Sequence, residues 1–211
     1  MMKRILFCMV PLCLLSSCKR YYRWGKQQFT QVDKRAGDDQ AVVSYLRSAD
    51  LYDEFQTVGM FDALWLSDEV RLHYLDQIAK RFALPNDKVA KMRKDGLEEN
   101  ERLLSFYLVM TQNNDGILPE LAARDAQATW AVVLRQDGKE YPVKTVTRVD
   151  LEPEYRQIFG KRYSRYRTAY KLDFNRYSSK MNDLFPANER PLELVIRSAK
   201  YNVSFSWRDN K

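Results

Sequence analysis

The chain is poor in the residues from which metal and nucleophilic sites are usually built. Its 211 residues include one histidine, His73, and three cysteines that all lie within the first 18 positions. A zinc site of histidine and cysteine ligands therefore cannot be assembled. A Ser-His-Asp triad would require His73, and no Gly-x-Ser-x-Gly turn accompanies it. We expect no metal and no cofactor, and we interpret His73 as an ordinary helix residue.

Glycine and proline are also scarce, with seven of each. Seven scattered glycines supply neither a phosphate-binding loop nor a dinucleotide fingerprint. The composition, 45% hydrophobic and 30% charged, excludes collagen-like, low-complexity and wholly disordered chains. The length allows one large domain or two small ones. We therefore expect a folded protein.

The chain lacks an apolar run long enough to cross a bilayer, which takes ~20 residues. Its most apolar stretch extends from Ile5 to Leu15, after the basic pair Lys3-Arg4 and before two serines. Basic, then apolar, then small residues is the order found in secretory signal peptides.

The end of this stretch, Leu15-Ser16-Ser17-Cys18, resembles the lipobox of bacterial lipoproteins. The resemblance implies removal of a signal peptide at residues 1–17 and a diacylglyceryl group on the Cys18 thiol, often with an acyl chain on the new amine. Two or three acyl chains anchor a protein stably, whereas one holds it marginally. In this family an Asp after the cysteine favours the inner membrane, so Lys19 implies the outer membrane. The alternatives are an ordinary secretory signal and an uncleaved amphipathic helix.

The rest of the chain divides by composition into three parts. Residues 18–40 are polar and are interpreted as the lipidated N-terminus and tether. Residues 41–103 are predicted to be a helical region, and residues 104–211 an antiparallel β domain. The expected fold class is α+β, with an N-terminal helical part followed by a C-terminal antiparallel β-sheet or small β-sandwich.

Several helix boundaries are readable in the helical region. The mixture of apolar and polar residues from Gln40 to Leu51 favours a helix, and residues 55–66 either continue it or form a short buried segment. Ser67 is placed to cap the next helix. Pro85 is expected to end it, and the pair Asn86-Asp87 to provide the following cap. The exposed side of that following helix is predicted to carry three lysines: Lys88, Lys91 and Lys94.

The β-rich region is predicted to contain five or six strands. The stretches with strand-like patterns are 105–111, 129–135, 141–149, 165–174, 192–197 and 201–207. Asp137-Gly138 favours a hairpin turn because it tolerates positive φ values. Pro142 suggests an edge strand, since it has no N–H to donate. The amide-rich stretch 113–116 predicts a loop.

The most basic stretch extends from Glu154 to Lys180, where eight basic residues stand against two acidic ones. Strand alternation predicts that Tyr166, Tyr170 and Phe174 turn inward and that the cations turn outward. The candidate anion-facing surface consists of Lys161, Arg162, Arg165, Arg167 and Lys171. The alternative is a solvated edge whose charges discourage strand pairing.

Together these patterns predict a membrane-anchored envelope lipoprotein that acts as a non-enzymatic binding or structural module. Its expected contacts are the membrane, through lipid on Cys18, and an envelope protein, with no nucleic acid. In one alternative the basic strand binds anionic lipid or cell-wall peptidoglycan. In another the chain is a cell-wall hydrolase, since that chemistry needs only two carboxylates brought together by the fold. The carboxylates considered are Glu98, Glu99, Glu101, Asp115 and Glu120, which occur in contexts typical of solvated residues.

Overall fold

The computed structural model describes residues 40–53, 56–111, 121, 130–177 and 191–207. The predicted signal peptide, Cys18, the tether before Gln40 and the loop predicted at 113–116 lie outside these residues. Residues 39–211 form one compact unit. Among the described residues, no helix is long and apolar enough to span a bilayer.

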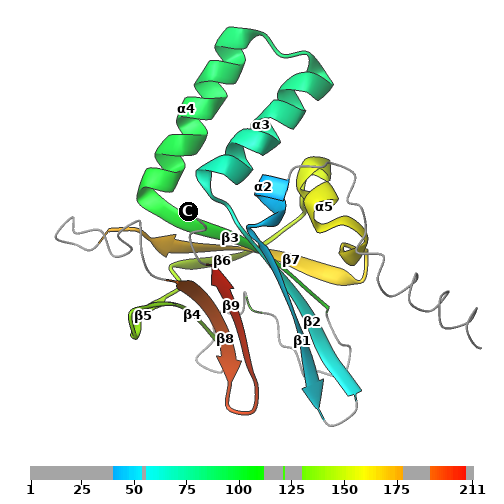
Figure 1. Ribbon diagram of the computed structural model, residues 1–211, viewed down its shortest axis with the longest axis vertical. Helices are drawn as coiled ribbons and strands as arrows, with labels where there is room; N and C mark the ends of the chain where they lie inside the picture. Colours follow the sequence, from blue (N-terminus) through cyan, green and yellow to red (C-terminus); the bar gives the residue numbers. More distant parts are fainter. Residues whose placement is uncertain (1–39, 54–55, 112–120, 122–129, 178–190, 208–211) are drawn as a thin grey trace, which may run out of the picture. The chain divides into compact units, whose positions relative to one another are not determined.

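The larger of two sheets has five antiparallel strands (Figure 1). They are β1 (Leu46–Asp53), β2 (Gln56–Trp65), β3 (Leu103–Thr111), β6 (Thr145–Val149) and β7 (Arg167–Asn175). Their spatial order, β1-β2-β3-β7-β6, places β3 in the centre. A central strand covered on both faces is apolar almost throughout, which is why β3 lacks a clean alternation.

The smaller sheet has four antiparallel strands in the order β5-β4-β8-β9. They are β4 (Trp130–Gln136), β5 (Lys139–Pro142), β8 (Leu192–Ser198) and β9 (Asn202–Trp207). The turn between β4 and β5 is the predicted Asp137-Gly138 hairpin, with φ values of 53° and 72°. Both the turn and the edge position of Pro142 are confirmed.

The two sheets share the larger hydrophobic core. Phe106 on β3 is completely buried there, with its ring centroid 5.9 Å from that of Phe174 and 5.2 Å from that of Trp207. Tyr170 is also buried in this core, so the inward placement predicted for it and for Phe174 is confirmed. The arrangement is a sandwich of two antiparallel sheets with helices added, and the predicted α+β class is confirmed.

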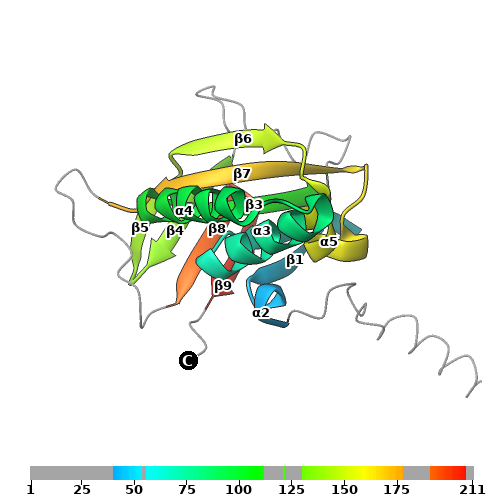
Figure 2. The same ribbon diagram turned by 90° about the horizontal axis from the view of Figure 1, so that it is seen from above.

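Helices cover the other face of the larger sheet. They are α2 (Gln40–Val43), α3 (Asp68–Phe82), α4 (Asn86–Arg102), α5 (Pro153–Phe159) and the short 3-10 helix η1 (Gly160–Arg162). A second core lies beneath α2, α5 and the start of α3, where Val70 and Phe159 pack near Val109 and Ala169 of the sheet. The α3–α4 hairpin extends away from the sheet (Figure 1), and the view from above places its helices over β3 and β7 (Figure 2).

The helix caps agree only in part with the sequence predictions. Ser67 caps α3 as expected, because its Oγ accepts a hydrogen bond from the Val70 N–H at 3.3 Å. Pro85 precedes α4 and occupies its N-cap, so the cap predicted from Asn86-Asp87 is wrong. Both of those residues already belong to the helix. The three lysines expected on the outer side of α4 are exposed: Lys88, Lys91 and Lys94.

Two predicted elements are wrong. The helix expected from Gln40 to Leu51 ends at Val43, and strands β1 and β2 follow because they pair along a ladder that local propensity does not reveal. The strand expected over residues 141–149 is divided between the two sheets. After Pro142 the chain crosses over, with the Val143 N–H donating to β4 and the Lys144 N–H donating to β7.

A polar network joins the base of the α3–α4 hairpin to the larger sheet. Glu99 accepts a hydrogen bond from Arg71 Nη1 at 2.9 Å and another from Lys171 Nζ at 2.7 Å. Arg71 Nε also donates to Asn100 Oδ1 at 2.6 Å. Burial raises the pKa of Glu99, but the hydrogen bonds and charges of Lys171 and Arg71 outweigh burial and lower it.

We expect Glu99 to make stability depend on pH. A carboxylate with a lowered folded-state pKa stabilises the fold above its ordinary value of 4.5, and this stabilisation is lost as the pH falls through the folded-state pKa. Urea unfolding measured from pH 7 downward should therefore show a smaller decrease in the free energy of unfolding in Glu99→Gln than in the wild type. The neighbouring Glu98→Gln is the control, since Glu98 is more exposed and forms an exposed ion pair with Lys94 on the same helix. An unchanged pH profile in Glu99→Gln would contradict this role.

Candidate functional site

Arg167, predicted to face solvent, is instead largely buried beneath the helical layer. Its side chain is 5% exposed and forms an ion pair with the fully buried carboxylate of Asp62 on β2. Its guanidinium also donates to the backbone carbonyls of Met60, Val109 and Arg162, each at 2.8–2.9 Å. The prediction is wrong because the polar face of β7 turns toward the helices rather than toward water.

Two more cations of the predicted anion-facing surface, Arg162 and Lys171, also form ion pairs with carboxylates. Arg162 Nη1 on η1 lies 2.8 Å from Asp62 Oδ1. Burial lowers the pKa of Arg162, but the hydrogen bond and charge of Asp62 outweigh burial and raise it. Lys171 Nζ lies 2.7 Å from Glu99 and 3.6 Å from Asp173. These two cations therefore do not form an open basic strand.

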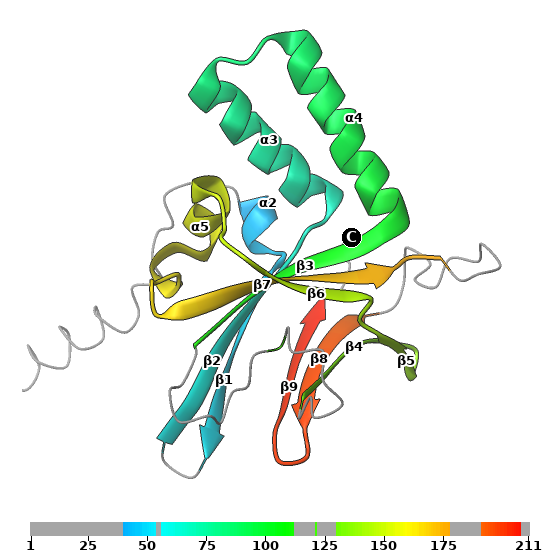
Figure 3. The same ribbon diagram turned by 180° about the vertical axis from the view of Figure 1, so that it is seen from behind.

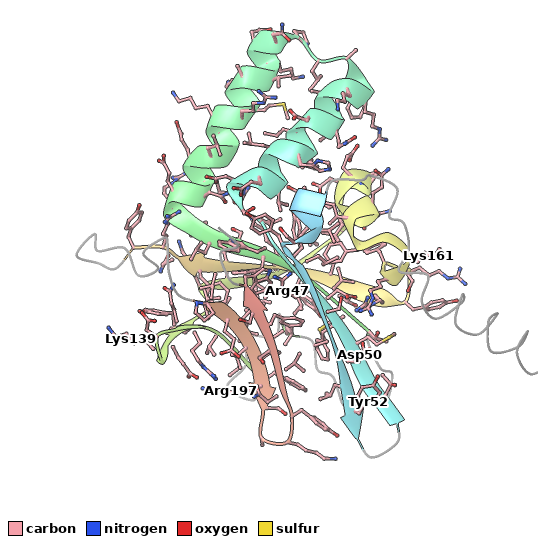
Figure 4. The ribbon with its side chains drawn as sticks, viewed as in Figure 1. Arg47, Asp50, Tyr52, Lys139, Lys161 and Arg197 are labelled. Carbon is pink, nitrogen blue, oxygen red and sulfur yellow. The ribbon has the colours of Figure 1, made fainter. Side chains whose placement is uncertain are left out.

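The last two predicted cations, Lys161 and Arg165, are exposed on the connection from α5 to β7. Figure 4 shows Lys161 at the turn that follows α5. The Arg165 guanidinium lies 4.8 Å from the ring centre of Tyr166 and donates to its hydroxyl at 2.5 Å. Tyr166 is 68% exposed, so its predicted inward position is wrong, because β7 begins only at Arg167.

Figure 3 shows the larger sheet from the side on which its edge strand β6 is in view. An open hollow of about 690 Å³ lies where this sheet meets the connection from α5 to β7. It forms at the end of the edge strand β6, where the chain leaves the sheet toward α5 and β7 extends further. Four arginines and one carboxylate contribute to its lining: Arg148, Arg156, Arg165, Arg167 and Asp150. Two of these arginines form ion pairs, Arg167 with Asp62 and Arg156 with Asp150.

Arg156 is held at the hollow by several contacts. Its Nε donates to the Leu151 carbonyl at 2.6 Å, and its Nη2 lies 2.6 Å from Asp150 Oδ1. Its guanidinium also lies over the Tyr163 ring, 5.3 Å from the ring centre. The Asp150 side chain is 85% exposed, so this ion pair is strongly screened by water.

The sequence analysis missed two of the arginines that line the hollow. Arg148 falls within the strand-like stretch 141–149 and Arg156 within the basic stretch 154–180, and neither pattern singles out these residues. Their presence at one hollow depends on the turn from β6 into α5, which brings residues 148–150 to the same part of the surface as Arg156 and Arg165. The sequence signal was limited to the basic composition of residues 154–180.

The other candidate groups are dispersed or lie elsewhere. His73 is half-buried on α3, away from any cluster of metal-ligating residues, and none of the described residues forms such a cluster. Glu98 and Glu99 form ion pairs, Glu101 is exposed near the end of α4, and Asp115 and Glu120 lie outside the described residues.

The chain matches no protein-family model, no curated protein and no solved structure.

Proposed function

We propose that this chain is a lipid-anchored, non-enzymatic binding module of the bacterial cell envelope. The observation that carries the proposal is the order of the first 18 residues: Lys3-Arg4, an apolar stretch, and then Leu15-Ser16-Ser17-Cys18. In this proposal Cys18 holds the acyl chains, residues 18–40 space the folded body from the bilayer, and the body binds another envelope component. Lys19 favours the outer membrane as the location.

The side chains of the folded body support binding rather than hydrolysis. The carboxylates that lie between its layers are held by cations, as Asp62 is by Arg167 and Glu99 is by Lys171. A general acid or nucleophile must instead face the substrate. The hollow is open and arginine-rich, and guanidinium groups suit recognition of an anionic group.

The anchor is tested by metabolic labelling of the full chain with radioactive palmitate in a bacterial host. We expect Cys18→Ser to abolish labelling and to leave the signal peptide uncleaved, because the thiol is the only attachment point for the diacylglyceryl group. The matched control is Cys13→Ser, which makes the same change within the apolar stretch and should keep full labelling.

Continued labelling of Cys18→Ser would overturn the proposal. The same conclusion would follow if the unaltered chain took up no label and were recovered from the soluble fraction. Equal loss of label in Cys13→Ser would also count against it, because the effect would then lie in export and not in the lipidated cysteine.

A further inference from the structure

Strand β6 lies at an edge of the larger sheet, on the outer side of β7 (Figure 2). In an antiparallel sheet, alternate residues of an edge strand turn both the N–H and the C=O away from the neighbouring strand. Among the described strands, only β7 pairs with β6. The other side of β6 is therefore an edge to which a further strand can add through backbone hydrogen bonds.

The other three edges of the described sheets carry features that discourage strand addition. Strand β1 contains a shift of register near its end, and Arg47 Nε on β1 donates to the Ser206 carbonyl of β9 at 2.9 Å. The edges formed by β1 and β9 therefore meet each other. Strand β5 carries Lys139 and Pro142, and lysine and proline are typical of protected edges.

No lysine, proline or shift of register occurs within β6. Four of its five residues, Thr-Val-Thr-Arg-Val, are β-branched, which favours strand pairing. Its pairing with β7 is regular from Thr145 to Val149. Thr147 and Arg148 are exposed. The composition and regularity of β6 therefore suit a strand that pairs on both sides.

The charges that flank β6 favour a second copy of β6 as the added strand. Opposite residues of paired strands share one face of the sheet, so two antiparallel copies of one strand are related by a two-fold axis at a single residue. With the axis at Thr147, Lys144 of each copy lies opposite Asp150 of the other. Lys144 is exposed, and the Asp150 side chain is 85% exposed. Each end of the paired strands then holds two opposite charges, which stabilise cross-strand pairing.

The two neighbouring registers bring like charges together. With the axis at Val146, Lys144 of each copy lies opposite Arg148 of the other. With the axis at Arg148, the two Arg148 residues lie opposite each other. Like charges directly opposite each other destabilise a sheet. The axis at Thr147 avoids both arrangements, because Arg148 then lies opposite Val146 and the two threonines lie opposite each other, a pair that can form a hydrogen bond.

We infer that two copies of this chain pair through β6 in antiparallel orientation about Thr147, which joins their larger sheets into one continuous sheet. The interface is isologous, since the same strand serves both copies. Asp150 already contacts Arg156 at 2.6 Å, but this exposed pair is weak and leaves the carboxylate accessible to Lys144 of the second copy. The inference goes beyond the proposed function and does not depend on the anchor.

Cysteine cross-linking in intact cells of a bacterial host tests the register. The chain has no cysteine after residue 18, so Thr147→Cys adds the only thiol of the folded body. Directly opposite residues of antiparallel strands have Cα atoms about 4.5–5.5 Å apart, within the range of a disulfide. We expect mild oxidation with copper phenanthroline to convert Thr147→Cys into a covalent dimer.

Thr145→Cys is the matched control, because it makes the same substitution on the same face of the same strand. With the axis at Thr147, the two copies of residue 145 lie four residues apart along the strands, ~14 Å, which is too far for a disulfide. We expect a dimer yield at least about tenfold lower than for Thr147→Cys. The oxidised wild type corrects for any linkage through the three cysteines of the first 18 residues.

Charge reversal tests the end pairs through the dissociation constant of the dimer, measured by sedimentation equilibrium of the full-length protein in nonionic detergent. Lys144→Glu and Asp150→Lys should each weaken the dimer by about tenfold, because two attractive pairs become repulsive. The double variant restores opposite charges and should return the dissociation constant to within about threefold of the wild type.

The α3–α4 hairpin supplies controls for the charge reversals. Lys91 is exposed on α4, and Asp76 on α3 forms an ion pair with Arg93 at 2.5 Å, much like that of Asp150 with Arg156. Lys91→Glu and Asp76→Lys make the same charge changes away from β6. They should leave the dissociation constant within about twofold of the wild type.

The inference is overturned if Thr145→Cys cross-links as well as Thr147→Cys, or if the full-length protein sediments as a monomer at every concentration. It is also overturned if the double charge reversal stays as weak as the single ones. A cross-link from Thr147→Cys to a different protein would mean that another chain adds to β6 in place of a second copy. Loss of palmitate labelling with intact cross-linking would overturn only the proposed anchor, and the reverse result would overturn only this inference.

Discussion

Replacing Asp62 with alanine is expected to lower the free energy of unfolding by about 3–5 kcal/mol, as for removal of one partner of a buried ion pair. Asp62 is fully buried, and its carboxylate accepts hydrogen bonds from Arg162, Arg167 and Ser48. The Arg167 side chain is itself 5% exposed, so the substitution leaves its charge buried without a counter-ion. Urea denaturation at pH 7, followed by circular dichroism, measures the change.

Two further variants separate this pairing from other effects of the substitution. Asp50→Asn removes a carboxylate from the exposed part of β1 (Figure 4) and should change stability by less than about 0.5 kcal/mol. The double variant Asp62→Leu with Arg167→Met should recover much of the loss, since buried pairs replaced by apolar residues of similar volume are often tolerated. If Asp62→Ala unfolded at the wild-type urea concentration, the buried pair would have no structural role.

Replacing Phe106 with alanine is expected to cost about 3–5 kcal/mol of unfolding free energy, as for other large aromatic residues removed from a core. Phe106 is completely buried between the two sheets and contacts Trp65, Phe174 and Trp207. The cavity would lie where the central strand of the larger sheet meets β9. Neighbouring rings cannot collapse into it without leaving their own packing.

The same substitution on the α3–α4 hairpin is the control for Phe106→Ala. Phe82 at the end of α3 is 59% exposed, and its ring contacts the Arg81 guanidinium at 5.0 Å from the ring centre. Phe82→Ala should therefore change the free energy of unfolding by less than about 0.5 kcal/mol. A large loss in Phe82→Ala with a small loss in Phe106→Ala would contradict the assignment of the core to the space between the sheets.

The sequence determined the local features whose physical cause lies within a few residues. The Ser67 cap needs only a hydroxyl before a helical stretch, and the Asp137-Gly138 turn needs only residues that tolerate positive φ. The inward placement of Tyr170 and Phe174 follows from the two-residue period of β7. The α+β class was also readable, because the change from helical to alternating patterns lies along the chain itself.

The tertiary structure decided everything that depends on which element covers which face. The alternation of apolar and polar residues distinguishes the two faces of β7, but it does not indicate that helices cover the polar face. Arg167 and Lys171 are therefore predicted to face solvent, whereas in the structure they form ion pairs with Asp62 and Glu99. The pairing of β1 with β2, and the crossing of the chain after Pro142, are likewise long-range events.

The hollow illustrates the same division between local and tertiary information. The sequence indicated a basic stretch but not which of its cations pair with carboxylates, because ion pairs form between residues up to 105 positions apart. Residues 148–150 line the same hollow as Arg156 and Arg165 only because β6 turns into α5 at the edge of the sheet. Charge content is a property of the sequence, whereas the local electrostatic field depends on how the fold brings charges together or separates them.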